Sequence, residues 1–210
     1  MGNPTQFSRE IPRRAQKLIS DLYDNLPDSQ PNNGLKLKAT FLLAVATPII
    51  TLPFERMARP KAHLGSEAFS EIIRKAINSK TKVENASFYA GCWRYYKLEK
   101  GDAFPRFAVE GFSQKIVQSL ATADALLAAK ELKSDVFCAN LRNALSHGSV
   151  FYLDENGNTG ENIRVNRFAF VSTDRARNPQ ALHIQSITLA GFRVFLEKWV
   201  AWLQTPGGPE

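Results

Sequence analysis

Residues 134–148 read SDVFCANLRNALSHG, and this segment is the most informative in the chain. Ser134 and Asp135 are residue types that commonly open a helix. Apolar side chains then recur at helical spacing at Phe137, Leu141, Ala144 and Leu145. Gly148 is the residue expected just past a helix end, because glycine tolerates a positive φ. The segment therefore predicts a helix that places His147 in its last turn.

The same spacing recurs along most of the chain. It predicts helices over about residues 10–26, 35–57, 66–77, 113–132 and 189–203. The helix over 35–57 is apolar nearly all round, which is typical of a buried helix. Pro48 should kink or split it, because proline removes a backbone hydrogen bond. Its charge-free run, residues 39–54, falls short of the roughly twenty residues that span a bilayer, so a core helix is favoured.

The pattern changes after Gly148. Residues 150–153 and 163–171 predict two strands, joined through the turn-forming sequence Asp154–Asn158. A third short strand fits residues 182–187, whereas the aromatic segment 88–96 has no assignable period. The fold class predicted is all-α, a helical bundle with a small β-hairpin or a three-stranded β element near the C-terminus.

One domain is predicted for residues 1–210, because a chain of this length suits a single sizeable core. The bundle would occupy about residues 10–148, the hairpin about 149–172, and the closing helix about 189–203. No internal repeat or low-complexity tract divides the chain.

The amino-acid composition limits the classes of protein and partner that are expected. A hydrophobic fraction of 44% and a charged fraction of 22% are those of a soluble globular protein. The net charge of +7 favours a polyanionic partner, nucleic acid first and a membrane surface second. Cys92 and Cys138 form no disulfide framework, and we expect no metal site and no cofactor. The N-terminus lacks the apolar run of a signal peptide, which favours the cytoplasm.

Arg142, Asn143 and His147 are the residues whose chemistry stands out. Asn143 and His147, four positions apart, share one face of the predicted helix. Arg142 and His147 lie about 140° apart around the axis and about 7.5 Å apart along it. One helix joins these two groups only if the arginine curls back. Two copies of the helix across a two-fold axis would line one cleft with both arginines and both histidines.

This set of side chains suits phosphodiester chemistry. A histidine can accept or donate a proton near neutral pH. An arginine offers a planar set of donors to phosphate oxygens and stabilises the charge that grows on them. RNA supplies its own nucleophile, the 2′-hydroxyl, so the reaction needs neither a metal nor a protein nucleophile. Asn143 could orient the histidine or hold a phosphate oxygen.

The arrangement of Arg142, Asn143 and His147 resembles the Arg-x4–6-His motif of the HEPN superfamily. The full stretch Leu141–Gly148, at a helix end, is similar to many members. The resemblance implies a helical bundle that is often dimeric. It also implies, for active members, metal-independent endoribonuclease activity at a site between two protomers. Carried over by motif position, Arg142 and His147 would be catalytic and Asn143 the supporting polar residue.

Three functional hypotheses follow. The first is a homodimeric endoribonuclease of a toxin or defence kind, which cleaves RNA by 2′-hydroxyl attack and has an antitoxin protein as a further partner. The second is a catalytically silent HEPN module that binds RNA or a nucleotide or serves as a dimerisation or assembly domain. The third, least favoured, is a protein that sits on anionic membranes. The structural alternative for the motif is an exposed histidine that meets the helix dipole, beside a solvated arginine.

Other basic residues are weaker candidates for RNA binding. Arg94 and Lys97 alternate with aromatic residues in the segment 93–97, where bases could stack and phosphates could bind. The alternative is a strip of core aromatics with solvated charges between them. Arg164 and Arg167 on the predicted hairpin could extend a phosphate-binding surface, although an exposed hairpin carries charge in any case. For His63 and His183 a structural or surface role is expected.

Overall fold

A computed structural model describes residues 7–27, 37–58, 68–78, 81–101, 104–160, 163–174 and 179–205. Its α-helices are α1 (Phe7–Leu22), α2 (Leu37–Ala58), α3 (Ala68–Ile77), α4 (Phe107–Glu110), α5 (Gln114–Ala121), α6 (Ala123–Glu131), α7 (Ser134–Ser146) and α8 (Leu189–Leu203). Its strands are β1 (Arg94–Glu99), β2 (Val150–Leu153), β3 (Arg167–Thr173) and β4 (Ala181–Thr188). The protein is mostly helical, and three of the four strands follow α7.

The sheet is larger than the hairpin or three-stranded element predicted. Its strand order is β1-β4-β3-β2, and all neighbours are antiparallel. The predicted third strand is β4, and the additional strand β1 comes from the aromatic segment without an assignable period. Arg94 of β1 lies opposite Ser186 of β4. Because this pairing joins segments far apart in the sequence, the local pattern could not reveal it.

The predicted hairpin forms, with β2 paired to β3, but the second strand begins later than expected. Strand β3 starts at Arg167 instead of residue 163. The turn after β2 is organised by the Asp154 carboxylate, which accepts hydrogen bonds from the backbone of Asn156 (2.9 Å) and Asn158 (2.8 Å). The connection is therefore a longer loop that starts as the sequence predicts.

The predicted helices are found, with two corrections. Helix α2 runs unbroken through Pro48 and Pro53, so Pro48, which was expected to kink or split the helix, does not split it. Residues 113–132 form two helices, because Thr122 adopts an extended conformation (ψ 162°). The Thr122 hydroxyl accepts a hydrogen bond from the Ala125 amide at 3.2 Å, which caps α6. The predicted cap at Ser66 lies outside the described residues.

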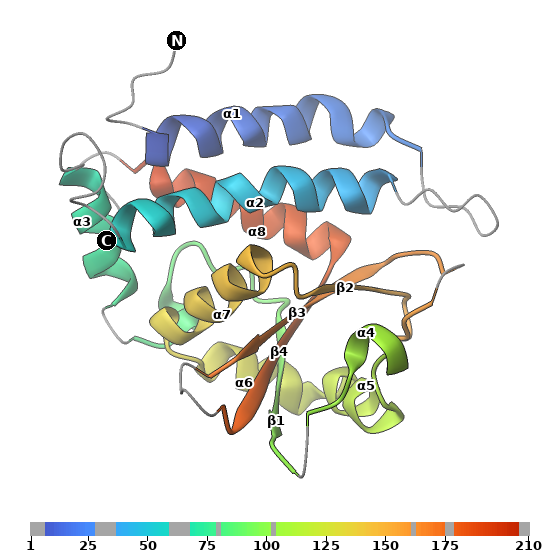
Figure 1. The fold of residues 1–210 in the computed structure, drawn as a ribbon. Coiled ribbons are helices and arrows are strands. Elements are labelled where there is room, and N and C mark those ends of the chain that lie inside the picture. The colour runs from blue at the N-terminus through green and yellow to red at the C-terminus, as the bar shows by residue number, and fades with distance from the viewer. Residues whose placement is uncertain are drawn as a thin grey trace.

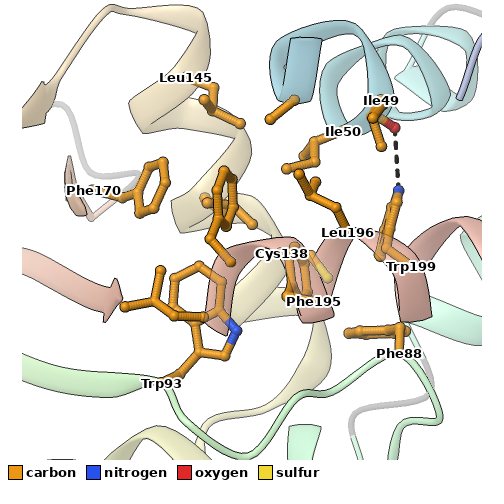
Figure 2. Packing of buried hydrophobic residues seen from close by; sticks show 14 of the residues in the cluster. Ile49, Ile50, Phe88, Trp93, Cys138, Leu145, Phe170, Phe195, Leu196 and Trp199 are labelled. Carbon is orange, nitrogen blue, oxygen red and sulfur yellow. Dashed lines mark hydrogen bonds between the residues drawn. The ribbon is translucent and has the colours of Figure 1, made fainter. Parts of the chain in front are cut away.

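The main core fills the space between the helices and one face of the sheet. Trp93 lies at its centre, with its ring centroid 5.1 Å from those of Phe137 and Phe195 in edge-on contacts. The Trp199 indole donates a hydrogen bond of 3.2 Å to the Ile49 carbonyl and so joins α8 to α2, as Figure 2 shows. Helices α1, α2 and α8 pack side by side above this core (Figure 1).

A second cluster covers the opposite face of the sheet. Phe107 of α4, Phe112 between α4 and α5, and Leu120 of α5 are buried there against strand residues such as Ala169 and Ile184. The sheet is therefore packed between the long helices and the short helices α4 and α5, as Figure 1 shows. Polar side chains on either face of such a sheet must find partners within the protein or in a ligand.

Helix α2 combines a buried side with an open one. By length and composition alone, Leu37–Glu55 could cross a membrane, a property that core helices of soluble proteins share, and a third of it is buried here. Its buried side chains include Leu42, Ala46 and Ile49, which pack in the main core. Ala44 on another side is exposed. Glu55, on the same side as Ala44, lies 3.8 Å from Arg142 of α7.

Candidate functional site

Helix α7 carries the motif, and both its start and its middle are attached to the rest of the fold. The Ser134 amide donates to the Thr81 carbonyl at 2.9 Å. From the sheet, the Ser172 hydroxyl donates to the Asn140 side-chain oxygen at 3.1 Å, and the Gln185 amide donates to the Phe137 carbonyl at 3.3 Å. These bonds set how α7 is rotated on the sheet and therefore which side chains face outward.

The end of α7 has the geometry that the sequence predicted. Gly148 has a φ of +66°, in the left-handed region. The Gly148 amide donates to the Leu145 carbonyl at 3.3 Å, and the Ser149 amide donates to the Ala144 carbonyl at 2.8 Å. These two bonds are the glycine cap that satisfies the last carbonyls of a helix. The backbone around His147 is therefore held from both sides.

His147 is the C-cap residue of α7, and its side chain is exposed. Its backbone amide donates to the Asn143 carbonyl at 3.0 Å. In the part of the chain that the structure describes, the imidazole forms no hydrogen bond and no ion pair. The imidazole is thus positioned by a fixed backbone and open to solvent, as a proton-transferring group or a surface residue would be.

Arg142 is half-buried and faces α2 rather than His147. Its Nη1 donates to the Asn143 side-chain oxygen at 2.9 Å, and its Nε lies 3.8 Å from a carboxylate oxygen of Glu55. Asn143 therefore orients the arginine, whereas the roles expected from the sequence were to orient the histidine or to hold a phosphate oxygen. Within one chain no described contact joins Arg142 to His147, in agreement with their angular separation on the helix.

A cavity of about 250 Å³ lies along α7 beside the motif. Asn143 and Asn140 line it from the helix, and the Asn140 amide nitrogen is buried without a hydrogen-bond partner. Asp135 also lines it from the first turn of α7, and Asp174 and His183 line it from the sheet side. Asp174 could not be found from the sequence, since only the packing of α7 on the sheet brings it near Asn143.

His183 has a structural setting inside this cavity. Its Nδ1 is 2.8 Å from the Tyr95 hydroxyl, and the two rings are stacked with centroids 6.0 Å apart. Burial lowers the pKa of His183, and the positive charge of Lys97 adds to this, while Asp174 and Glu99 oppose it. The imidazole is therefore biased toward its neutral form, as a half-buried histidine within a polar network should be.

The four weaker RNA-binding candidates do not form one surface. Lys97 pairs with Glu99 at 2.7 Å. Arg164 is exposed and lines a cavity of about 750 Å³ next to the start of α8. Arg94 and Arg167 do come together, in a separate cavity of about 220 Å³ on the α5 face of the sheet. Neither of these two cavities includes Arg142 or His147 among its lining residues.

No group of three or more histidine, cysteine, aspartate or glutamate side chains within the described ranges is placed to hold a metal ion. Cys92 and Cys138 are unpaired, and burial raises the pKa of both thiols. At the end of α7, His147, Arg142 and Asn143 present an imidazole, a guanidinium and an amide.

Comparison with known proteins gives one finding. Residues 1–208 match the family model described as HEPN pEK499 p136. No curated protein and no solved structure matches the chain. The match spans nearly the whole chain, including α7 with Arg142 and His147 at its end, and the chain therefore belongs to the HEPN family.

Proposed function

We propose that the protein is a metal-independent endoribonuclease whose active site is assembled from two copies of the chain. The observation that carries the proposal is the end of α7, where a glycine cap holds an exposed His147 one turn after a half-buried Arg142. Membership of the HEPN family supports it, and the net charge of +7 suits an RNA substrate.

In this mechanism the RNA 2′-hydroxyl attacks the adjacent phosphorus and the 5′-oxygen leaves. In each site, His147 of one copy accepts the proton of the hydroxyl and then, as the imidazolium, protonates the leaving oxygen. The Arg142 guanidinium, oriented by Asn143, donates to the phosphate oxygens on which negative charge grows. The products are a 2′,3′-cyclic phosphate and a 5′-hydroxyl.

The open side of α2 supports a second copy as the partner. Partly or fully exposed residues follow one another every three or four positions along this helix, and we name them the α2 stripe: Leu37, Phe41, Ala44, Pro48, Thr51 and Glu55. The stripe is largely apolar and ends at Glu55, beside Arg142. A two-fold contact in which the two α2 helices lie parallel along the stripe would bring the ends of two α7 helices toward one another.

The direct test is RNA cleavage in EDTA, with analysis of the product ends. We expect cyclic phosphate ends, and we expect His147→Ala to lower the rate at least about a hundredfold, the usual contribution of a general acid or base. Because His147 is exposed, this variant should keep the stability of the wild type. Uncleaved RNA, or cleavage that survives in the folded variant, would refute the proposal.

A mixing experiment tests whether the site is shared. If each site combines Arg142 of one subunit with His147 of the other, Arg142→Ala and His147→Ala homodimers are both inactive. Mixed dimers then regain one intact site, so random exchange should restore about a quarter of the wild-type activity. A site within one chain would show no recovery, because each chain carries its own defect.

The second candidate function is a catalytically silent module that binds RNA or nucleotides or serves in assembly. One observation favours it: within a single chain Arg142 is engaged by Asn143 and near Glu55, and not by His147. This alternative predicts RNA affinity that falls with salt, without turnover under any condition in which the protein is dimeric.

A further inference from the structure

Two arginines and a serine lie together on the face of the sheet opposite the one on which α7 packs. Arg94 of β1 lies directly opposite Ser186 of β4, and Ser186 lies opposite Ala169 of β3. Arg167 is two residues from Ala169 and so points to the same side. Arg94, Arg167 and Ser186 line the cavity of about 220 Å³ that α5 covers. The sheet thus lines this cavity with three side chains that can donate hydrogen bonds.

Two of these donors have no partner. Ser186 is only 1% exposed, and its hydroxyl forms no hydrogen bond. The Arg167 Nε is also buried without a hydrogen-bond partner. Buried polar groups are nearly always hydrogen-bonded, because burial removes their bonds to water. Two such groups line one cavity and are available to an acceptor.

Arg94 and Arg167 give the cavity a positive charge, which favours an anion as the hydrogen-bond acceptor. Arg94 is held in place by hydrogen bonds from its Nη1 to the carbonyls of Leu120 (2.8 Å) and Thr122 (2.9 Å). Arg167 is half-buried, and its pKa is lowered by burial and then by the positive charge of Arg94. Neither guanidinium forms an ion pair with a carboxylate anywhere in the described ranges. A bound anion would offset both the burial of the Arg167 guanidinium and its repulsion by Arg94.

We propose that this cavity binds a phosphate group, with Arg167 Nε and the Ser186 hydroxyl as donors and Arg94 as a fixed positive charge. The cavity volume of about 220 Å³ is below the roughly 300–1,000 Å³ of pockets for larger ligands, which favours a small oxyanion. Glu155 also lines the cavity, but its side chain is exposed and can turn to water. The site is independent of the nuclease chemistry, since α7 packs on the other face of the sheet.

Inorganic phosphate is the probe for the first experiment. Thermal unfolding and titration calorimetry would compare phosphate with chloride at equal ionic strength for wild type, Ser186→Ala and Arg167→Gln. Arg164→Gln is the matched control, because Arg164 lies three residues before Arg167 in the sequence but lines a different cavity. Phosphate stabilises most proteins weakly by exclusion from their surface, so only the differences between variants count.

We expect phosphate at about a hundred times its Kd to raise the Tm of the wild type and of Arg164→Gln by about 5 °C or more. Ser186→Ala and Arg167→Gln should lose most of this shift and bind phosphate at least about tenfold more weakly. Without phosphate, Ser186→Ala should be as stable as the wild type or more so, because the variant removes a buried hydroxyl without a partner. Glu155→Gln should bind phosphate more tightly.

The source of the phosphate is found with short RNAs that carry a 5′-phosphate or a 5′-hydroxyl, in the His147→Ala background to prevent cleavage. Tighter binding of the phosphorylated RNA, lost with Arg167→Gln, would assign the site to an RNA end. Equal binding of both RNAs, together with the phosphate shift, would assign it to a free phosphate compound. The proposal would be overturned if the wild type showed no phosphate shift, or if Ser186→Ala and Arg167→Gln showed the same shift as the wild type.

Discussion

The Arg142 guanidinium donates a 2.9 Å hydrogen bond to the side chain of Asn143, its neighbour in the sequence. Adjacent residues on a helix point about 100° apart, so this bond requires the arginine to bend around the helix toward Asn143. Glu55 of α2 lies 3.8 Å from the Nε on the other side. The orientation of Arg142, which we propose to bind the phosphate that is cleaved, therefore depends on its neighbour Asn143 and on the distant Glu55.

Removing the local partner should cost activity more than stability. In Asn143→Ala we expect kcat/KM for RNA cleavage to fall about tenfold to a hundredfold, because a misplaced arginine stabilises the transition state less well. The free energy of unfolding should fall by no more than about 1 kcal/mol, the value of one partly exposed hydrogen bond. Steady-state kinetics and urea unfolding measure the two effects. Asn85→Ala, at an exposed position, is the control and should change neither.

A charge on the α2 stripe should separate the subunits. Ala44 is exposed, so Ala44→Glu should leave the fold of one chain intact. In a dimer packed along the stripe, the two carboxylates would be buried without partners, and we expect the dimer Kd to rise at least about a hundredfold. Sedimentation equilibrium gives the Kd.

Leu127→Glu is the matched control for the dimer, because Leu127 is 57% exposed on α6, away from the stripe. This variant should dimerise and cleave RNA like the wild type, whereas Ala44→Glu should lose activity together with the dimer. A wild-type protein that stays monomeric at all concentrations would contradict the shared site.

Removing the glycine cap of α7 should measurably lower the stability of the protein. Gly148 has a φ of +66°, but an added Cβ would meet no atom within 4 Å. Gly148→Ala should therefore destabilise the protein only through the strain of a left-handed backbone, by roughly 1–2 kcal/mol in urea unfolding. Gly101→Ala, also in open space but without a positive φ, should stay within about 0.5 kcal/mol of the wild type. Equal stabilities of the two variants would argue against the cap.

His183 should make stability depend on pH. Its pKa in the folded protein is lowered, so the unfolded chain binds more protons as the pH falls below the ordinary histidine value of about 6.5. The contribution of His183 to the free energy of unfolding is therefore fully present above about pH 6.5 and is lost progressively at lower pH. Between pH 7.5 and pH 5 we expect the wild type to lose more stability than His183→Gln in urea unfolding. An equal loss in both proteins would show that His183 does not contribute.

Most helices could be predicted because their signals are local. Apolar residues every three or four positions marked α1, α2, α7 and α8. The break in the helix predicted over residues 113–132 was missed, since Thr122 is compatible with a helix interior and becomes a boundary only through its cap on Ala125. Strand β1 was missed for a stronger reason, because it exists through pairing with β4, which lies about eighty residues further along the chain.

The sequence by itself determined where α7 ends and which chemical groups stand at that end. A glycine that adopts a positive φ and a helical apolar pattern act over a few residues, so Arg142, Asn143 and His147 could be placed without any other element. Only the tertiary structure decided that Arg142 turns toward Glu55 and that Arg94 meets Arg167 and Ser186 in one cavity. Such contacts join distant segments, and their geometry depends on how the helices and the sheet pack against one another.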